Sequence, residues 1–328
     1  MPSARRKRRC PPAPDPSQHE SSKAPSLTGP FHLRRGRRIW RRTGGGTMRI
    51  GVALGSGAAR GLAHIPYIEA MDELGLKPSV IAGSSIGALI GAGWANGMTG
   101  AELREHAYSV LGSLQQIAST LWNRNRFSFK QIVEDGLSVQ VNSKGITKAF
   151  LPEGFPDDFA ELAIPFSVVA TDFYAWKEVV FDSGPLRPAI AASLAIPSLF
   201  RPVNVEGRYF IDGGVTNPLP LGLIAGRCDV LIGIDVHRTP ELLDASREPS
   251  ITDSAVVATE IMSQKLVDAT VLQYPPDVYV RAEVGPFGGS EFWRVREIVD
   301  NAAGDKDRFK RAISDALLAH SIRKANRP

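Results

Sequence analysis

The feature that most constrains the fold is the stretch Gly83-Ser84-Ser85-Ile86-Gly87, which joins an apolar, β-branched run to an alanine- and leucine-rich run. The first run is typical of a buried strand and the second of a helix. A serine on a tight strand-to-helix turn adopts strained backbone angles, which lift its hydroxyl above the first turn of the helix. Free amides and the positive end of the helix dipole favour developing negative charge there. The pattern predicts that Ser85 is a nucleophile, with Gly83 and Gly87 making room for the turn; a plain strand-to-helix turn is the alternative.

A glycine-rich loop lies between the apolar run of residues 49–54 and a helical segment at residues 62–74. Small residues between a strand and a helix allow backbone amides to point at an anion. The amides of Gly57 and Ala58 are therefore expected to hold an oxyanion, and Gly55 of the same loop is expected to belong to this oxyanion hole.

A dinucleotide-binding fingerprint is the main alternative for this loop. It fails at the third glycine, because Arg60 stands in that place and Gly61 follows it. The acidic residue that should end a second strand about twenty residues further on is also missing. We expect Arg60 either to brace the loop or to contact an anionic head group, and Gly61 to support the turn.

An acidic residue at the end of another predicted strand is the second candidate for catalysis. Residues 207–211 have strand composition and lead directly into Asp212-Gly213-Gly214. In open α/β sheets, ligands bind at the carboxyl ends of the strands. Asp212 is therefore a candidate catalytic acid, with Gly213 and Gly214 shaping its turn; a surface turn without a catalytic role is the alternative.

Two histidines close to these motifs are candidate bases. His237 follows an apolar strand-like run at residues 230–236, and Ser85, Asp212 and His237 occur in the chain order of an α/β-hydrolase triad. His64 comes one helical turn after the glycine-rich loop. A hydrogen-bonded helix histidine is the simpler interpretation of His64.

Strands alternate with helices from about residue 49, which predicts one doubly wound α/β domain with a mostly parallel sheet between helical layers. Residues 48–250 are expected to form the catalytic domain and residues 251–328 a helical extension packed on it. Between residues 99 and 160, residues 101–114 have a helical pattern and the rest is irregular. Its aromatic residues could line an acyl pocket or an interfacial lid, or pack in the core: Trp122, Phe127 and Phe129.

The basic character of the chain belongs to its first 47 residues. They hold 12 of the 39 Lys and Arg but only two of the 34 acidic residues, so the rest of the chain carries a net charge of −5. Their composition predicts a disordered basic tail. An arm for anionic lipid or nucleic acid, a solvated tail, and translation that begins at Met48 remain open; no nucleic acid is expected on the folded domain.

Several classes of protein are not supported by the sequence. Two cysteines, Cys10 and Cys228, exclude a disulfide framework and a CxxC metal site, which suits a reducing compartment. Metal-binding motifs are missing, so we expect neither metal nor cofactor. No apolar run approaches the ~18 residues of a membrane span, and no apolar segment follows the first arginines as in a secretory signal. A cytoplasmic location is expected.

The stretch from Met48 to about Leu318 resembles the patatin-like phospholipase family, and in particular a bacterial branch similar to the catalytic domain of neuropathy target esterase. Four motifs in order carry the resemblance: Leu54-Gly55-Ser56-Gly57-Ala58-Ala59-Arg60-Gly61, Gly83-Ser84-Ser85-Ile86-Gly87, Ala191-Ala192-Ser193-Leu194-Ala195-Ile196-Pro197 and Asp212-Gly213-Gly214-Val215-Thr216-Asn217-Pro218-Leu219-Pro220.

The resemblance implies a patatin-like fold and a dyad in which Asp212 activates Ser85, with the glycine-rich loop as the oxyanion hole. It also implies ester bonds of phospholipid or lysophospholipid as the target, with peripheral contact to the inner membrane. The glycine-rich loop departs from the family's pattern at two positions, because Ser56 and Ala58 stand where the family usually has glycine. A protein that binds lipid without turnover, and a Ser-His-Asp esterase that uses His237, are the alternatives.

Overall fold

The computed structural model describes residues 48–124, 147, 150–152, 154–197, 199–239, 248–289 and 291–326. These described residues all belong to one compact unit. The predicted basic tail, residues 1–47, lies outside the described residues, as do Phe127, Phe129 and the side chain of Trp122.

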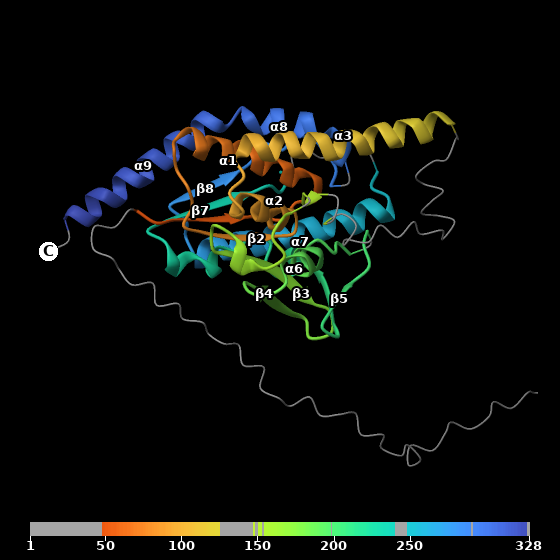
Figure 1. Cartoon of the computed structure of the whole chain (residues 1–328), viewed down its shortest axis with the longest axis horizontal. Helices are drawn as coiled ribbons and strands as arrows, with labels where there is room; N and C mark the ends of the chain where they lie inside the picture. The colour runs from red at the N-terminus through yellow and green to blue at the C-terminus, as the bar shows by residue number, and fades with distance from the viewer. Residues whose placement is uncertain are drawn as a thin grey trace, which may run out of the picture. The chain divides into compact units, whose positions relative to one another are not determined.

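An eight-stranded sheet forms the centre of this unit (Figure 1), with seven strands in the order β5-β6-β3-β2-β1-β7-β8 and β4 paired to β3. The pairs β3–β2, β2–β1, β1–β7 and β7–β8 are parallel, which confirms the predicted mostly parallel sheet. The strands are β1 (Ile50–Leu54), β2 (Val80–Ser84), β3 (Phe166–Asp172), β4 (Lys177–Phe181), β5 (Val203–Val205), β6 (Arg208–Asp212), β7 (Val230–Asp235) and β8 (Val278–Arg281).

One end of the sheet is antiparallel, because β6 pairs antiparallel with both β3 and β5, and β4 pairs antiparallel with β3. β6 runs back along β3 from its carboxyl end and stops beside Ala170, two residues before β3 ends, so its last residue, Asp212, still lies near the carboxyl edge of the parallel strands. In the register, Ser84 of β2 faces Val169 of β3, and Asp212 faces Ala170 of the same strand. A single strand therefore separates the turn after β2 from the end of β6.

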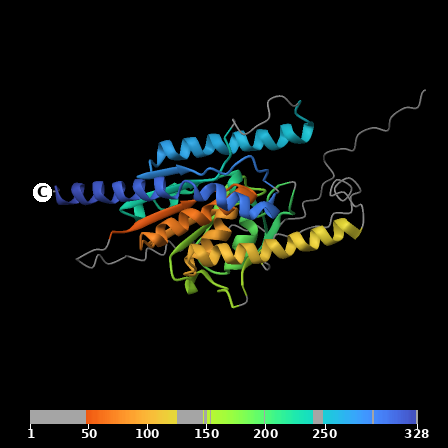
Figure 2. The same ribbon diagram turned by 90° about the horizontal axis from the view of Figure 1, so that it is seen from above.

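Helices cover both faces of the sheet. Figure 1 shows α1, α3, α8 and α9 above the sheet, and Figure 2 shows α3 and α7 along opposite margins of the unit. The α-helices of eight or more residues in the described part are α1 (His64–Glu73), α2 (Ile86–Ala95), α3 (Gly100–Arg124), α6 (Leu186–Ser193), α7 (Ile251–Gln273), α8 (Val295–Ala303) and α9 (Lys306–Ala325).

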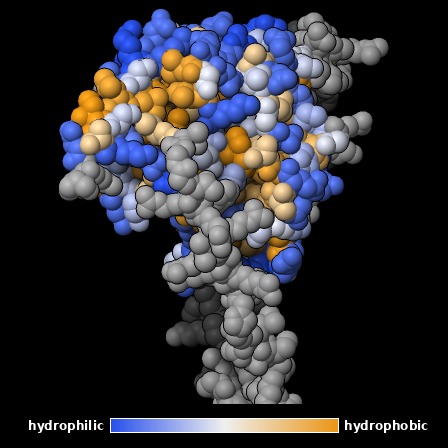
Figure 3. Space-filling model, turned by 60° about the vertical axis from the view of Figure 1, so that its left-hand side comes forward, coloured by the Kyte–Doolittle hydropathy of each residue, from blue (hydrophilic) through white to orange (hydrophobic). Residues whose placement is uncertain are grey.

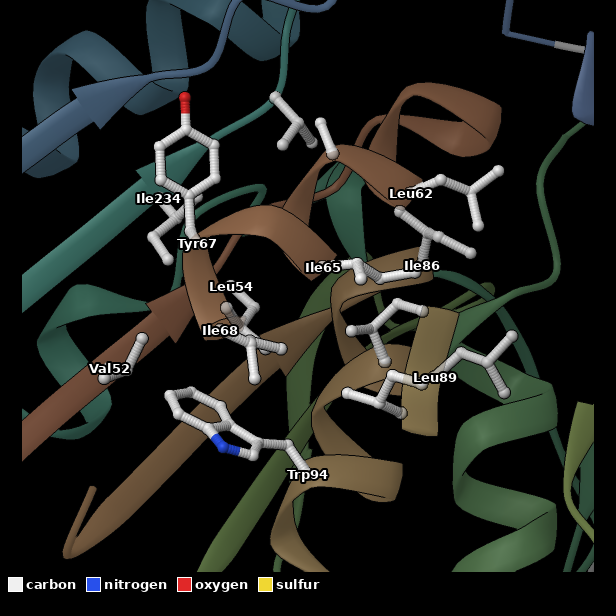
Figure 4. Close-up of a cluster of buried hydrophobic side chains, with 14 of the residues drawn as sticks. Val52, Leu54, Leu62, Ile65, Tyr67, Ile68, Ile86, Leu89, Trp94 and Ile234 are labelled. Carbon is white, nitrogen blue, oxygen red and sulfur yellow. The ribbon is translucent and has the colours of Figure 1, made fainter. Parts of the chain in front are cut away.

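Alternation along the strands divides the core between the two faces. Val52 and Leu54 of β1 belong to the larger cluster, which α1, α2, α3, α8 and α9 also line. Figure 4 shows part of it, with the two β1 residues among side chains of α1 and α2. Ala53 points to the opposite face and packs in a smaller cluster with Val267 of α7. Apolar burial on both faces fixes the position of each strand end.

The surface is mixed in character. In Figure 3, one face of the molecule shows several hydrophobic patches separated by hydrophilic residues. Within the described residues, no helix is both long enough and apolar enough to cross a membrane.

Candidate active site

Ser85 lies on the turn between β2 and α2 with backbone angles φ 55° and ψ −123°. A positive φ in a residue other than glycine costs about 1–3 kcal/mol and persists only where the surrounding structure enforces it. Part of that constraint comes from Ser193 of α6, whose Oγ accepts a 2.8 Å hydrogen bond from the Ser85 amide. The predicted strained turn with serine at its centre is therefore present.

The Ser85 hydroxyl donates a hydrogen bond of 2.5 Å to Oδ2 of Asp212, which is 127 residues further along the chain. The other carboxylate oxygen, Oδ1, accepts the Gly214 amide at 2.7 Å. Both side chains are buried, at 2% and 5% exposure. The contact is direct, so a proton can pass from the hydroxyl to the carboxylate without an intervening residue.

Burial raises the pKa of Asp212 to about 7, although the hydrogen bonds from Ser85 and Gly214 oppose that rise by favouring the charged form. A general base works best when its pKa lies near the working pH. Asp212 is therefore charged in part at neutral pH and able to take a proton.

The five glycines expected to support the motifs are sites of close approach between chain segments. A methyl group on Gly87 would lie 2.7 Å from the Gly55 carbonyl oxygen, and one on Gly214 would lie 2.7 Å from Ser56 Oγ. These contacts place the glycine-rich loop against both the Ser85 turn and the Asp212 turn. A methyl group at each of the remaining three positions would also clash: Gly61 with Ile86, Gly83 with Gly87, and Gly213 with Ser84 and Val169.

The amides of the glycine-rich loop are not equivalent. The Gly55 amide donates to the Ile234 carbonyl at 3.0 Å, and the Ser56 amide donates to the Pro218 carbonyl at 2.8 Å. Gly55 was expected to be an oxyanion donor, and this prediction is wrong for the conformation observed, because its amide is already engaged in tertiary structure. Gly57 lies just before a 3-10 helix (Ala58–Ala63). Ala58 is the first residue of that helix, so the Ala58 amide has no hydrogen-bond partner within it. Both remain the proposed donors.

Ala58 adopts φ 52°, the left-handed region that favours glycine. We expect Ala58→Gly to raise the free energy of unfolding by about 1 kcal/mol, since it removes a left-handed alanine that costs about 1–2 kcal/mol. Ester turnover should stay within about threefold, because the amide is retained. Denaturant unfolding and a soluble-ester assay measure the two quantities.

Ala59→Gly is the matched control for that prediction. Ala59 is fully buried in the same 3-10 helix and is not among the residues with positive φ. Its replacement should lower the free energy of unfolding by about 1 kcal/mol, the usual cost of glycine in a helix. If Ala58→Gly and Ala59→Gly lowered the free energy of unfolding by the same amount, the Ala58 backbone would not be strained.

Arg60 braces the loop. Its side chain is only 4% exposed, Nη2 donates to Glu260 Oε1 of α7 at 3.0 Å, and Nη1 donates to the Phe287 carbonyl at 3.4 Å. Arg238 donates to the other oxygen of the same glutamate at 2.6 Å. Of the two roles expected for Arg60, this geometry favours the brace, because the guanidinium is buried and bonded to other parts of the protein.

The histidines have other partners than Ser85. His64 Nε2 donates to the Gly55 carbonyl at 2.8 Å, and burial lowers the pKa of His64 to about 4, so it is neutral at pH 7. His237 Nδ1 donates to Asp235 Oδ1 at 2.6 Å, and Nε2 lies 2.8 Å from Ser263 Oγ. The alternative triad of Ser85, Asp212 and His237 is therefore not assembled, because both ring nitrogens of His237 are engaged elsewhere.

Three contributors to this region were not identified from the sequence: Ser193, Glu260 and Ser263. Ser193 lies within a motif that supported the family resemblance, but nothing in its local pattern indicates a partner 108 residues away. Glu260 and Ser263 lie on α7, where they look like ordinary polar positions of a helix. In the described part of the chain, no group of three or more His, Cys, Asp or Glu is placed to hold a metal ion.

Comparisons with known proteins give consistent matches. A family model described as "Patatin-like phospholipase" matches residues 52–224. An uncharacterised NTE family protein of Mycobacterium tuberculosis is 35% identical over 212 residues, which cover 64% of this chain and 55% of that protein. Lysophospholipase NTE1 of Mycosarcoma maydis is 28% identical over 291 residues, which cover 81% of this chain and 15% of the relative. The chain thus spans just over half the length of the mycobacterial relative.

Among solved structures, VipD from Legionella pneumophila matches with a TM-score of 0.43 and 14% identity, over 81% of this chain and 67% of that one.

Proposed function

The chain belongs to the patatin-like phospholipase family, and on that basis we propose that it hydrolyses acyl esters of lipids, with Ser85 as nucleophile and Asp212 as its base. Phospholipid or lysophospholipid is the proposed substrate, since the fungal relatives are named lysophospholipases. The observation that carries the proposal is the 2.5 Å hydrogen bond from the Ser85 hydroxyl to the Asp212 carboxylate.

The proposed reaction has two half-reactions. Asp212 takes the hydroxyl proton as Ser85 Oγ attacks the ester carbonyl carbon, and the amides of Gly57 and Ala58 hold the oxyanion. The tetrahedral intermediate then collapses: the carbon–oxygen bond to the alcohol breaks, Asp212 returns its proton to the leaving oxygen, and the acyl group stays on Ser85. Loss of one oxyanion donor typically costs about 10²–10³ in turnover.

Water completes the second half-reaction. Asp212 takes a proton from the water molecule that attacks the acyl-enzyme, and gives it to Ser85 as the fatty acid leaves. The same carboxylate therefore serves as base and acid in both halves. No metal or cofactor enters the proposed scheme.

A hydrolysis panel tests the substrate class. Full-length protein is incubated with phospholipids and lysophospholipids of several head groups, and released fatty acid is measured beside Ser85→Ala as a matched control. We expect release by the wild type and only background release by the variant. Equal release by both would place the reaction away from Ser85, and no release from any lipid would favour the alternative of a lipid-binding protein without turnover.

The pH dependence of turnover follows from the raised pKa of Asp212. Its carboxylate must be ionised to accept the Ser85 proton, so turnover of a soluble ester should rise with pH up to about 7, the value to which burial raises this pKa, and level off above it. Below that value the rate should fall about tenfold per pH unit. Measurement of kcat/KM across this range reports the free enzyme. A profile that stays flat well below neutral pH would show that Asp212 is not the base.

A further inference from the structure

The turn between β3 and β4 presents aromatic side chains to solvent. Within the turn, Trp176 is 86% exposed, Tyr174 is 77% exposed, and Phe173 is also exposed. Tyr209, on the neighbouring strand β6, is exposed beside them. Their rings pack edge-on, with centroids 5.1 Å apart for Phe173 and Tyr174 and 6.3 Å apart for Tyr174 and Tyr209. Contiguous apolar surface of this kind on a folded protein indicates a site of interaction. We call these four residues the aromatic hairpin.

The aromatic hairpin is held in a fixed shape. Asp172 Oδ1 accepts the amides of Tyr174 at 3.0 Å and Ala175 at 2.8 Å, while Oδ2 accepts Arg208 Nε at 2.9 Å. The Trp176 amide donates to the Asp172 carbonyl at 3.0 Å, and Trp176 adopts φ 53°, a left-handed conformation that a tryptophan rarely takes. Such a turn displays its rings before it meets a partner, so little conformational entropy is lost on binding.

The aromatic hairpin projects from the same edge of the sheet as the candidate dyad. Asp212 faces Ala170 in β3, and the chain continues for three residues to Phe173. At about 3.3 Å per residue, Phe173 lies roughly 10 Å beyond Asp212 along the strand direction. In Figure 1, β3 and β4 lie at the lower margin of the ribbon. Whatever binds the aromatic hairpin is therefore brought close to Ser85 and Asp212.

The charges around the aromatic hairpin indicate the kind of partner. Residues 172–178 and 199–209 carry three acidic and three basic side chains: Asp172, Glu178 and Glu206, and Lys177, Arg201 and Arg208. The surface has no net charge, which matches a zwitterionic lipid surface better than a strongly anionic one. Tryptophan and tyrosine combine an apolar ring with a polar edge, and they concentrate in the head-group region of bilayers.

We propose that the aromatic hairpin inserts its Tyr174 and Trp176 side chains into the head-group region of a zwitterionic lipid surface and so holds the candidate dyad against it. The proposal rests on the proposed function, since it supplies the lipid substrate in its aggregated form. Attachment of this kind depends on apolar rings rather than on net charge, so high salt should not weaken it.

Vesicle binding tests the proposal independently of turnover. Full-length Ser85→Ala protein is sedimented with phosphatidylcholine vesicles at high salt, which suppresses attraction through the basic residues 1–47. The same protein with Tyr174→Ser and Trp176→Ser should bind at least about tenfold more weakly, since two exposed rings are lost. Leu272→Ser is the matched control: Leu272 is 83% exposed on α7, beside the opposite edge strand β8, and its loss should leave binding unchanged.

Turnover gives a second readout in protein that keeps Ser85. The double variant Tyr174→Ser and Trp176→Ser should hydrolyse a soluble ester at the wild-type rate, which shows that it folds, and vesicle lipid about tenfold more slowly. Failure of Ser85→Ala protein to bind phosphatidylcholine vesicles, or equal binding with and without the two rings, would overturn the proposal. A change in oligomeric state with unchanged vesicle binding would assign the aromatic hairpin to a second copy of the chain. Loss of hydrolysis with intact vesicle binding would contradict the proposed function alone.

Discussion

Asp212→Asn is expected to lower ester turnover by about 10³–10⁴-fold while the protein stays folded. Asparagine has the shape of aspartate, so its carbonyl oxygen can still accept the Gly214 amide that Asp212 Oδ1 accepts at 2.7 Å. It cannot take the proton of the Ser85 hydroxyl, which now donates to Oδ2 at 2.5 Å. Steady-state kinetics with a soluble ester, together with circular dichroism, separate loss of the base from loss of the fold.

His237→Ala is the control for that result. The Nδ1 and Nε2 atoms of His237 are engaged with Asp235 and Ser263, so its removal should disturb packing near α7 and leave turnover within about tenfold of the wild type. His64→Ala should behave in the same way. A folded His237→Ala protein as inactive as Asp212→Asn would show that a histidine, and not Asp212, takes the proton.

The second large effect expected of Asp212→Asn is higher stability in alkaline solution. Burial raises the pKa of Asp212 from 3.8 to about 7, so in the folded protein the neutral form is favoured. Between these two values the unfolded chain has released its proton and the folded chain has not. Stability of the wild type therefore falls as pH rises through this window, by up to about 4 kcal/mol once the pH exceeds 7.

Asparagine does not ionise, so the stability of the variant does not fall with rising pH for this reason. Thermal unfolding of both proteins should show a gap in Tm that is small near pH 4, grows towards pH 7 and is then constant, reaching on the order of 10 °C. The inactive variant would then be the more stable one, as expected where a site holds a buried charge for catalysis. A gap in Tm that does not change with pH would mean that the pKa of Asp212 is close to its ordinary value.

The local part of the site was predictable from the sequence, because its geometry depends on neighbouring residues. The strand, the Ser85 turn and the helix that follows it are encoded within about ten residues, and the expected backbone strain at Ser85 is present as a positive φ. The mostly parallel sheet followed from alternating strand and helix patterns. The short strand β5 was not predicted, because three residues give too little periodicity to identify.

The contacts of the site between distant parts of the chain were harder to predict from the sequence. The residues themselves made Asp212 a candidate, but its pairing with Ser85 followed only from the family resemblance, since it depends on β3 lying between β2 and β6. Gly55 was placed among the oxyanion donors because it belongs to the same glycine-rich loop as Gly57 and Ala58. That amide is taken by Ile234, 179 residues away, which only the fold reveals. The contact of His237 with Ser263 of α7 is likewise visible only in the folded structure.

The most direct test of the proposed dyad is covalent labelling by a fluorophosphonate probe, with the modified residue identified by mass spectrometry of the full-length protein. We predict labelling at Ser85, slowed by about 10³-fold or more in Asp212→Asn and kept within about tenfold in His237→Ala. Labelling at another serine, in particular Ser263 beside His237, or loss of labelling in a folded His237→Ala protein, would contradict the dyad.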